Sequence, residues 1–555
     1  MIYPKIPLAQ SIIEICKAKG ITDIVISPGS RNAPLTIGFV NNPFFKCYSI
    51  VDERCAAFFA MGIAQQIKKP VAVVCTSGSA LLNYYPAVAE AFYSQIPVVV
   101  ISADRPTEKI DIGDGQTIRQ QNVFQNHSLY NANLKDGLVD EAENEQLINE
   151  AINTAIEKKG PVHINAPFEE PLYDTIPQLT VSPEILASKT NEATISSVEL
   201  ESYATQWNAA SKKLILIGTN EPNTIDSKII EYWAQDPSVI VMTETTSNVH
   251  HATFLDHIDT IITPFTKEDF LAFQPDILIT FGGMVVSKRI KAFLRGYQPK
   301  EHWHIDVLRA YNTYGCLTKH FEVSVNTFWN ALIPLVQNNP SDYKEHAHAI
   351  QLLRAQKHTE YLKSIPFSDF KVFEKVIPAL PDNSMLHLSN SSAIRYAQLV
   401  PIDPSIEVFC NRGTSGIDGS TSTAVGAAVA SSKMTILLTG DIGFFYDSNA
   451  IWNNYTPSNF KIILINNGGG GIFRILPGHQ ESEVFNTFFE TSHQLSAEQL
   501  AKMYDYHYSN VSTEADLVAT LPNFFNSNDK PCLLEIHTPE KLNNDILLQY
   551  FKNLV

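Results

Sequence analysis

Apolar and polar residues alternate in blocks along the chain. Short apolar runs rich in Val, Ile and Leu end at Gly, Ser or a charged residue, and longer segments with apolar residues at helical spacing lie between them. Such runs predict strands of parallel sheets that are buried on both faces and connected by helices. The predicted strands fall into three groups: 23–26, 45–51, 71–75, 98–101 and 162–165; 214–217, 239–242, 277–281 and 303–305; and 385–388, 407–410, 435–438, 462–465 and 532–536.

Two polar stretches separate these groups. A segment punctuated by Pro and Ser runs from 171 to about 197, and a second, partly helical segment runs from 337 to about 357. A chain of 555 residues is also too long for one hydrophobic core. We therefore expect an α/β protein with three doubly wound parallel-sheet domains, at residues 1–175, 196–336 and 360–555.

Two windows of the chain have the same layout. Each contains a strand, a Gly turn, a helix with aromatic residues (444–455 in the second window) and another strand. The separation from Gly78 to Asp104 equals that from Gly440 to Asn466. This equality predicts that the first and third domains share one fold.

The second window carries the strongest candidate chemistry. Its strands end at Gly440-Asp441 and at Asn466-Asn467, and a run of four glycines follows. Ligands of parallel sheets sit beyond the carboxyl ends of the strands. A carboxylate, an amide oxygen and backbone groups exposed by glycine suit Mg²⁺ bound to a diphosphate. Either dipeptide alone is ordinary turn chemistry, so it is the pair that favours a cofactor site.

Polar clusters also follow other predicted strands. They are SPGSR at 27–31, DER at 52–54, TSG at 76–78, ADRP at 103–106, QTIRQ at 116–120, NRGTSGIDG at 411–419 and NNGGGGIF at 466–473. With the GD and NN pairs, these windows resemble those of thiamine diphosphate enzymes. Ile442 replaces the last Gly of the usual GDG motif, and in this the chain resembles the menaquinone-pathway family that makes 2-succinyl-5-enolpyruvyl-6-hydroxy-3-cyclohexene-1-carboxylate. The windows run from residue 27 to residue 473, with members in the first and third predicted domains.

The resemblance implies the thiamine diphosphate-binding fold, with pyrimidine, central and diphosphate domains. It implies that Glu53 hydrogen-bonds the aminopyrimidine of the cofactor and that Ile417 holds the two cofactor rings at an angle. A desolvated Glu can share a proton near neutral pH, as such a role requires. Asp441, Asn467 and the Gly469 carbonyl would hold Mg²⁺ or Mn²⁺. The other implied cofactor contacts are Ser389, Asn390, Gly416, Gly440, Ile442, Gly443 and Ile472.

The resemblance also implies a reaction. 2-Oxoglutarate would be decarboxylated, and its four-carbon unit would be added to isochorismate in a 1,4 sense. Both substrates are dicarboxylates, which suits clusters of Arg. Ser391, Arg395 and Arg412 would clamp the 2-oxoglutarate-derived group, and Arg31, Arg105, Gln116, Lys288 and Arg289 would face isochorismate. The implied catalytic residues are Glu53, Arg31, Ser391, Arg395 and Arg412, and Ser30, Phe473 and Leu476 complete the implied substrate contacts.

Glu53 and Asp441 fall in different predicted domains. In the superfamily the cofactor lies between these two domains of different subunits. The resemblance therefore implies a homodimer or homotetramer with active sites at the subunit interface.

Composition restricts the partners and the compartment. The formal net charge of −17 disfavours nucleic acid and anionic membranes as partners. The seven cysteines are scattered without a CxxC pair, which is typical of buried thiols in a reducing compartment. The N-terminal segment reads as an amphipathic helix rather than a signal peptide, and no stretch is as long and apolar as a membrane span. We expect a cytoplasmic enzyme.

Three alternatives remain. The chain could be another thiamine diphosphate enzyme, such as a 2-oxoacid decarboxylase or an acetohydroxyacid synthase, the latter often with FAD. A non-catalytic protein that kept the fold is disfavoured because Glu53, Asp441 and Asn467 are all present. Gly282-Gly283 resembles part of a nucleotide-binding turn, but the G-x-G-x-x-G spacing of nicotinamide oxidoreductases is absent. No role is predicted for His127.

Overall fold

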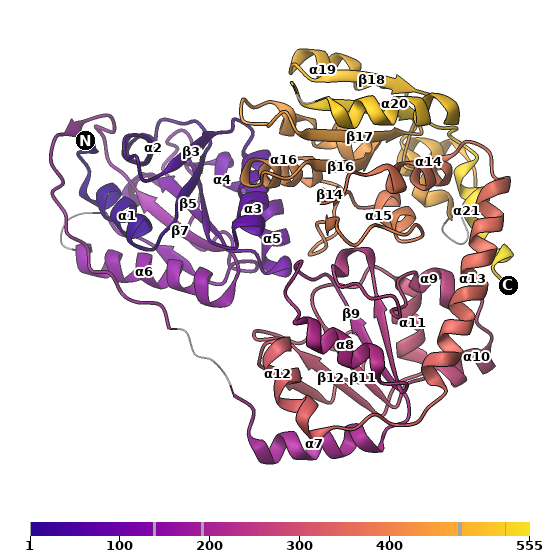
Figure 1. Ribbon diagram of the computed structural model, residues 1–555. Helices are drawn as coiled ribbons and strands as arrows, with labels where there is room; N and C mark the ends of the chain where they lie inside the picture. Colours follow the sequence, from indigo (N-terminus) through magenta and orange to yellow (C-terminus); the bar gives the residue numbers. More distant parts are fainter. Residues whose placement is uncertain (1, 137–139, 190–193, 476–479, 528) are drawn as a thin grey trace.

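A computed structural model describes residues 2–136, 140–189, 194–475, 480–527 and 529–555. Within these ranges the chain forms three α/β domains, each around its own sheet of parallel strands (Figure 1). The first domain lies at the left of Figure 1, the central domain at the lower right and the third domain above the central one. The predicted α/β class is confirmed.

The first domain has a six-stranded sheet of order β3-β2-β4-β5-β7-β6. Its strands are β2 (Asp23–Ile26), β3 (Lys46–Ser49), β4 (Val71–Cys75), β5 (Val98–Asp104), β6 (Asn131–Asn133) and β7 (Val162–Pro167). Its helices are α1 (Pro7–Ala18), α2 (Ala33–Val40), α3 (Glu53–Ile67), α4 (Ser79–Asn83), α5 (Tyr85–Ser94), η1 (Thr107–Lys109) and α6 (Glu141–Lys158). A separate antiparallel pair joins β1 (Tyr3–Pro4) to β8 (Thr175–Ile176).

The central domain has a five-stranded sheet of order β10-β9-β11-β12-β13. Its strands are β9 (Lys213–Ile217), β10 (Val239–Thr243), β11 (Ile277–Phe281), β12 (Glu301–Ile305) and β13 (Lys319–Phe321). Its helices are α7 (Ser197–Ala209), α8 (Ser227–Gln235), η3 (Thr245–Ser247), α9 (Ile258–Ile262), α10 (Lys267–Phe273), α11 (Lys288–Gly296), α12 (Val325–Leu332) and η4 (Ile333–Leu335).

The third domain has a six-stranded sheet of order β15-β14-β16-β17-β19-β18. Its strands are β14 (Met385–Leu388), β15 (Glu407–Phe409), β16 (Thr435–Gly440), β17 (Phe460–Asn466), β18 (His507–Val511) and β19 (Cys532–His537). Its helices are α14 (Asp369–Val376), η5 (Ile377–Ala379), α15 (Ser392–Ala397), α16 (Ser420–Ala430), α17 (Asp441–Tyr446), η6 (Ser448–Ile451), η7 (Gly471–Ile475), α18 (Glu483–Phe485), the π-helical turn η8 (Asn486–Glu490), α19 (Glu498–Met503), α20 (Glu514–Asn526) and α21 (Asn543–Asn553).

The first and third sheets have the same strand order. By position, β4 and β5 of the first sheet correspond to β16 and β17 of the third. These are the strands of the two windows that the sequence analysis compares, so the predicted repeat of one fold is confirmed.

One predicted helix is much shorter than expected. The segment 444–455 was predicted to be helical throughout, but α17 ends at Tyr446 and the short turn η6 follows. At Asp447 the backbone leaves helical geometry (φ −113°, ψ 25°). The Asp447 carboxylate instead accepts hydrogen bonds from the backbone N–H and the hydroxyl of Ser422, at 2.8 and 2.9 Å. Because these hydrogen bonds hold Asp447 against α16, helix α17 does not continue past Tyr446.

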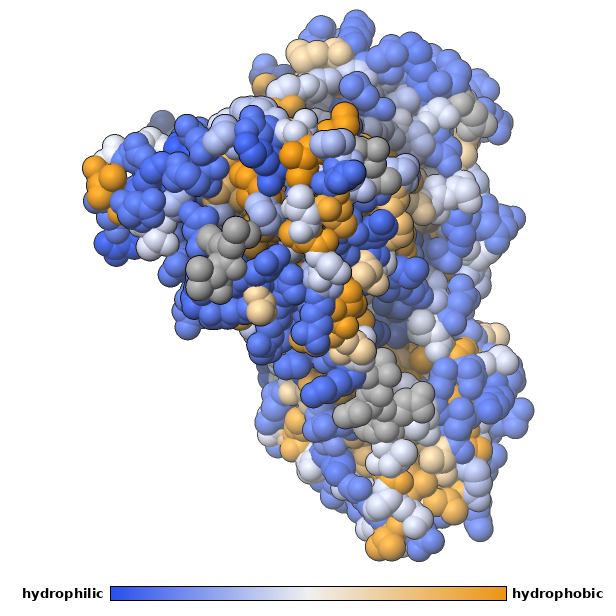
Figure 2. Space-filling model, turned by 90° about the vertical axis from the view of Figure 1, so that its left-hand side faces the viewer, coloured by the Kyte–Doolittle hydropathy of each residue, from blue (hydrophilic) through white to orange (hydrophobic). Residues whose placement is uncertain are grey.

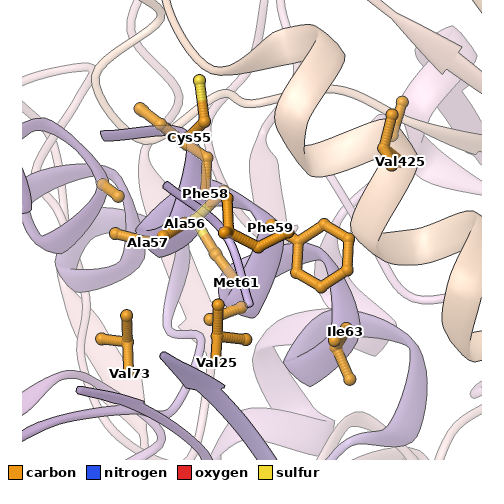
Figure 3. Packing of buried hydrophobic residues seen from close by; sticks show 14 of the residues in the cluster. Val25, Cys55, Ala56, Ala57, Phe58, Phe59, Met61, Ile63, Val73 and Val425 are labelled. Atoms are coloured by element: carbon orange, nitrogen blue, oxygen red, sulfur yellow. The ribbon is translucent and has the colours of Figure 1, made fainter. Parts of the chain in front are cut away.

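The first and third domains share one hydrophobic core. Helices α3 and α16 pack face to face between them, and Figure 3 shows Phe58, Phe59 and Met61 of α3 near Val25 and Val73, with Val425 of α16 beside them. A Cβ on Gly62 would lie 2.1 Å from the Thr423 carbonyl oxygen. Glycine therefore lets the two helix backbones come this close.

Helix α13 (Tyr343–Ser364) joins the central domain to the third and runs along the right edge of Figure 1. Near its start the Lys344 N–H donates to the Pro237 carbonyl of the central domain. Near its end the Tyr361 hydroxyl donates to the Ile546 carbonyl of α21 at 2.6 Å. The polar segment predicted as a partly helical connection is therefore mostly one long helix.

Among the residues that the structure describes, we find no helix with the length and hydropathy needed to cross a bilayer.

Candidate active site

The carboxyl ends of β16 and β17 lie side by side, because Gly440 pairs in register with Ile465. Asp441 follows β16 as the first residue of α17, and its side chain is buried. Its Oδ2 accepts hydrogen bonds from the backbone N–H groups of Gly468 and Gly469, at 2.9 and 3.0 Å. Burial raises the pKa of Asp441, and the backbone donors oppose that shift. The strand pairing thus brings Asp441 of the GD motif into direct contact with the glycines that follow the NN motif.

Asn467 and Gly469 lie in the same turn. The Asn467 amide Nδ2 donates to Asp369 at 2.9 Å, and no hydrogen-bond donor within the described ranges reaches its Oδ1. The Gly469 carbonyl accepts from the Gly471 N–H at 3.0 Å and keeps a second lone pair. Gly468 has φ +79°, a left-handed conformation that favours glycine.

The donor set of this turn fits a hard cation. A carboxylate, an amide oxygen and a carbonyl oxygen are the ligands that Mg²⁺ prefers, and Mg²⁺ usually completes its octahedron with phosphate oxygens and water. Within the described parts of the chain, no group of three or more His, Cys, Asp or Glu side chains could hold a metal. The turn therefore suits a cation that binds together with a diphosphate rather than in a full protein cage.

The loops after β14 and β15 border this turn. Asn390 Nδ2 donates to the carbonyls of Asn411 and Gly416, both at 2.7 Å, so this side chain organises the second loop. A Cβ on Gly443 would lie 3.7 Å from the Ile417 carbonyl, so the same loop packs on α17. Of the predicted cofactor contacts, the structure groups Ser389, Asn390, Gly416, Ile417, Gly440, Asp441, Ile442, Gly443, Asn467 and Gly469 along this edge of the sheet.

A short turn carries the remaining predicted contacts of the third domain. Ile472 lies in η7 and lines a small cavity together with Arg395 and Asn467. Phe473 is 36% exposed and its ring lies 6.1 Å from that of Phe489. Leu476 lies outside the described residues.

Cations of the central and third domains gather near this edge. Arg412 Nη1 donates to Asn390 Oδ1 at 2.6 Å. Burial and then the charge of Arg412 lower the pKa of Arg395. Arg289, at the start of α11, faces the half-buried Asp259 together with Arg395, and both oppose the rise in the Asp259 pKa that desolvation causes. Lys288 and Arg289 were predicted to face isochorismate together with Arg31 and Arg105; within one chain Arg289 lies near Arg395, since both act on Asp259.

The predicted first-domain residues form a second group. Arg31 is buried and donates from Nη1 to the Phe168 carbonyl at 2.9 Å, and its Nη2 pairs with Glu170 at 3.1 Å. Arg105 Nη1 lies 3.9 Å from the same Glu170 carboxylate. Ser30 is exposed in the turn before Arg31, and a Cβ on Gly78 would lie 3.4 Å from the Gln116 carbonyl. These turns meet at the carboxyl edge of the first sheet, as the sequence windows predict.

Glu53 lies at the same edge of the first sheet. It is the first residue of α3, which Asp52 caps by accepting from the Cys55 N–H at 3.1 Å. The Glu53 carboxylate adds to burial in raising the pKa of the Cys75 thiol, so it faces the end of β4. Within one chain the start of α3 also touches α17, because Arg54 Nη2 donates to the Tyr446 carbonyl at 2.6 Å.

Several functional-site neighbours escaped the sequence analysis. The Leu495 N–H donates to His493 Nδ1 at 3.1 Å, so the ring proton sits on Nε2, which lies 3.4 Å from Asp441 Oδ2. Asp369 contacts Asn467. Neither residue stands in a recognisable motif. His127, for which no role was predicted, packs among aromatic rings and accepts from or donates to the Tyr85 hydroxyl at 3.0 Å.

Glu90 holds the loop that carries Arg412. This first-domain side chain is buried, and its carboxylate accepts from the Gly413 and Thr414 N–H groups at 2.6 Å each and from the Thr414 hydroxyl at 2.8 Å. The only local hint in the sequence is one acidic residue inside an otherwise apolar and small run, AVAEAF.

Replacing Glu90 should loosen this loop. We expect Glu90→Ala to lower the free energy of unfolding by about 3 kcal/mol, because three hydrogen bonds to a charged group are lost and two backbone N–H donors lose their partner. The KM for 2-oxoglutarate, whose carboxylate Arg412 is predicted to bind, should rise. Urea unfolding and steady-state kinetics measure the two effects. The surface control Glu143→Ala, which removes only an ion pair with Lys135, should change neither; a Glu90→Ala protein as stable as wild type would contradict the prediction.

A cavity of about 590 Å³ opens where the three domains meet, and Arg412 lines part of it. Neither Glu53 nor Asp441 lines this cavity. The turns of Gly218 and Gly283 also border it or lie next to it, and a Cβ on Gly218 would lie 2.1 Å from the Gly283 carbonyl oxygen. These glycines therefore serve close packing of two turns, in agreement with the absence of a dinucleotide fingerprint.

Comparison with known families gives three matches that together cover most of the chain. Residues 6–132 match the N-terminal TPP binding domain of thiamine pyrophosphate enzymes, residues 187–388 their middle domain, and residues 391–536 their C-terminal TPP binding domain.

Full-length relatives are also similar to the chain. A 2-succinyl-5-enolpyruvyl-6-hydroxy-3-cyclohexene-1-carboxylate synthase of Flavobacterium psychrophilum is 65% identical over 554 residues and covers 100% of both chains. The synthase of the same name from Flavobacterium johnsoniae is 64% identical over 555 residues, again with full coverage. That of Christiangramia forsetii is 54% identical over 572 residues and covers 99% of each chain.

Proposed function

The chain belongs to the family of 2-succinyl-5-enolpyruvyl-6-hydroxy-3-cyclohexene-1-carboxylate synthases, which are thiamine diphosphate enzymes, and we propose that it catalyses the reaction of that name. In this reaction of menaquinone biosynthesis, 2-oxoglutarate is decarboxylated and its four-carbon unit is added to isochorismate in a 1,4 sense. The observation that carries the proposal is the contact between Asp441 and the Asn467–Gly469 turn at the carboxyl edge of the third sheet.

This edge would hold the cofactor. Asp441, the Asn467 amide oxygen and the Gly469 carbonyl would bind Mg²⁺ or Mn²⁺, and the metal would bind the diphosphate. Thiamine diphosphate, when bound, would supply the carbon nucleophile that adds to the keto group of 2-oxoglutarate and the cationic ring that takes up the electron pair released by decarboxylation. Ile417 packs beside Gly443, two residues after Asp441, and would hold the cofactor rings against each other.

The cations would orient the two dicarboxylates. Arg395 and Arg412, with Ser391, would bind the 2-oxoglutarate-derived group, since they lie together beside Asn390. Arg31, Arg105 and Gln116 would face isochorismate from the first domain. Lys288 and Arg289 of the central domain would also face isochorismate. Bidentate Arg–carboxylate contacts of this kind fix both position and orientation.

The active sites would lie between two copies of the chain, in a homodimer or homotetramer. Glu53 lies in the first domain and Asp441 in the third. Apolar side chains are exposed beside the start of α3, with Val51 41%, Tyr446 54% and Trp452 47% accessible. Figure 2 shows apolar residues gathered in patches on the side of the molecule where the first domain lies. Sedimentation equilibrium should give at least twice the mass of one chain, and a fully active monomer would refute the assembly.

Product analysis tests the reaction. Mass spectrometry of an incubation with isochorismate and 2-oxoglutarate should show the named product only when thiamine diphosphate and Mg²⁺ are both present. Release of succinic semialdehyde in place of that product would identify a 2-oxoacid decarboxylase instead. Turnover of pyruvate alone would favour an acetohydroxyacid synthase.

A further inference from the structure

Asp369 is a buried carboxylate behind the predicted metal site. It is the first residue of α14, its side chain is only 3% exposed, and it precedes residues 391–536, which match the C-terminal family domain. Its Oδ2 accepts from Asn467 Nδ2 at 2.9 Å, and its Oδ1 accepts from the Thr538 hydroxyl at 2.5 Å. The Asp369 N–H donates to Asn543 Oδ1 at 2.8 Å. Elements α14, β19 and α21 therefore fix the position of this carboxylate.

The contact determines which way the Asn467 amide faces. An asparagine amide carries a donor on one side and an acceptor on the other, and an ionised carboxylate can only accept. Asp369 therefore holds the Nδ2 side, and Oδ1 must face away from it. Among the residues that the structure describes, no other hydrogen bond reaches the Asn467 side chain. Asp369 alone sets this orientation.

We propose that Asp369 is a positioning residue that presents the Asn467 oxygen to the metal ion, supported by Thr538. The inference rests on the proposed function, since it takes Asn467 as a metal ligand. Without Asp369 the amide could turn its NH₂ group toward the cation, and binding would then have to select the correct orientation. Removing a group that orients a metal ligand typically costs about 10–100-fold in metal affinity.

Isothermal titration calorimetry tests the proposal. The full-length protein is titrated with MgCl₂ at saturating thiamine diphosphate. Asp369→Ala should raise the half-saturating Mg²⁺ concentration roughly 10–100-fold. Its kcat should approach the wild-type value once Mg²⁺ is saturating, because Asp369 does not touch the reacting groups. Asp369→Asn should shift the Mg²⁺ requirement less, because its Oδ1 can still accept from Asn467 while its Nδ2 donates to the Thr538 oxygen. Thr538→Val should give a smaller shift in the same direction.

A second buried carboxylate provides the matched control. Asp447→Ala removes the hydrogen bonds to Ser422, so it should lower the Tm without changing the Mg²⁺ requirement. A folded Asp369→Ala protein with an unchanged half-saturating Mg²⁺ concentration would overturn the proposal. If Asp369→Ala does not fold, an unchanged requirement in both Asp369→Asn and Thr538→Val overturns it.

The failure of this inference can be told apart from failure of the proposed site. If Asp441→Asn raises the Mg²⁺ requirement and Asp369→Ala does not, only the role of Asp369 is wrong. If neither change affects the Mg²⁺ requirement, the predicted metal site itself is wrong.

Discussion

Glu53→Gln is expected to lower kcat/KM roughly 10²–10⁴-fold, the usual contribution of a positioned acid or base. This corresponds to about 3–5 kcal/mol of transition-state stabilisation. Glutamine has nearly the same size and keeps one hydrogen-bonding oxygen, but it cannot exchange a proton with a ring nitrogen of the cofactor. Steady-state kinetics with isochorismate and 2-oxoglutarate measure the loss.

The protein should otherwise be intact. Asp52, not Glu53, caps α3, so the Tm of Glu53→Gln should stay close to that of wild type. Glu14→Gln offers a matched control, because Glu14 forms an ion pair with Lys17 on α1 and is not among the predicted site residues. A Glu53→Gln protein with the wild-type kcat/KM would contradict the proposed role of the Glu53 carboxylate.

Asp441→Asn is expected to raise the Mg²⁺ requirement by more than roughly 100-fold, the upper end of what loss of a group behind a ligand costs. The change removes the only carboxylate of the predicted donor set, so the charge that neutralises the metal is lost as well. Calorimetry with MgCl₂ at saturating thiamine diphosphate measures the shift. An unchanged Mg²⁺ requirement in Asp441→Asn would mean that the metal binds elsewhere in the protein.

Mixing the two inactive variants tests where each active site lies. If Glu53 of one subunit acts with Asp441 of another, mixed dimers of Glu53→Gln and Asp441→Asn contain one intact site. Random exchange should then restore about a quarter of the wild-type activity. If both residues of a site came from the same chain, every site would carry a defect and mixing would restore nothing.

Buried central strands are well predicted by their apolar runs. β4, β11 and β14 begin and end at the predicted residues, because each is a mostly apolar run with a Gly, Ser or Thr turn after it. Three edge strands of the parallel sheets, β6, β13 and β18, were missed, although the edge strands β3, β10 and β15 were predicted. β6 reads Asn-Ala-Asn and β18 reads HYSNV, and both lie at the margin of a sheet, where half of the side chains meet solvent or polar neighbours. An apolar-run criterion cannot detect such strands.

The site residues also divide into those that a local sequence pattern predicts and those that it does not. Asp441 and Asn467 could be predicted because parallel strands deliver their ends to one edge and because the two motifs stand at a fixed separation. Asp369 and Glu90 could not, because each reaches its partner only through the tertiary fold, across 98 residues for Asp369 and 323 for the Gly413 contact of Glu90. A lone carboxylate gives no pattern to read. The wrong helix prediction at 447–455 has the same cause, since the Asp447 carboxylate accepts hydrogen bonds from Ser422 of α16.

The core shared by α3 and α16 also affects how the chain is made. Helix α3 ends at Ile67 and α16 begins at Ser420, so roughly 350 residues must be synthesised before the partner of that apolar face exists. At ribosomal rates of about 5–20 residues per second, the face stays uncovered for about 20–70 s. During that interval the nascent chain presents Phe58 and Phe59 to the cell rather than to Val425, so the ribosome-bound protein should be a client of chaperones that bind exposed apolar segments.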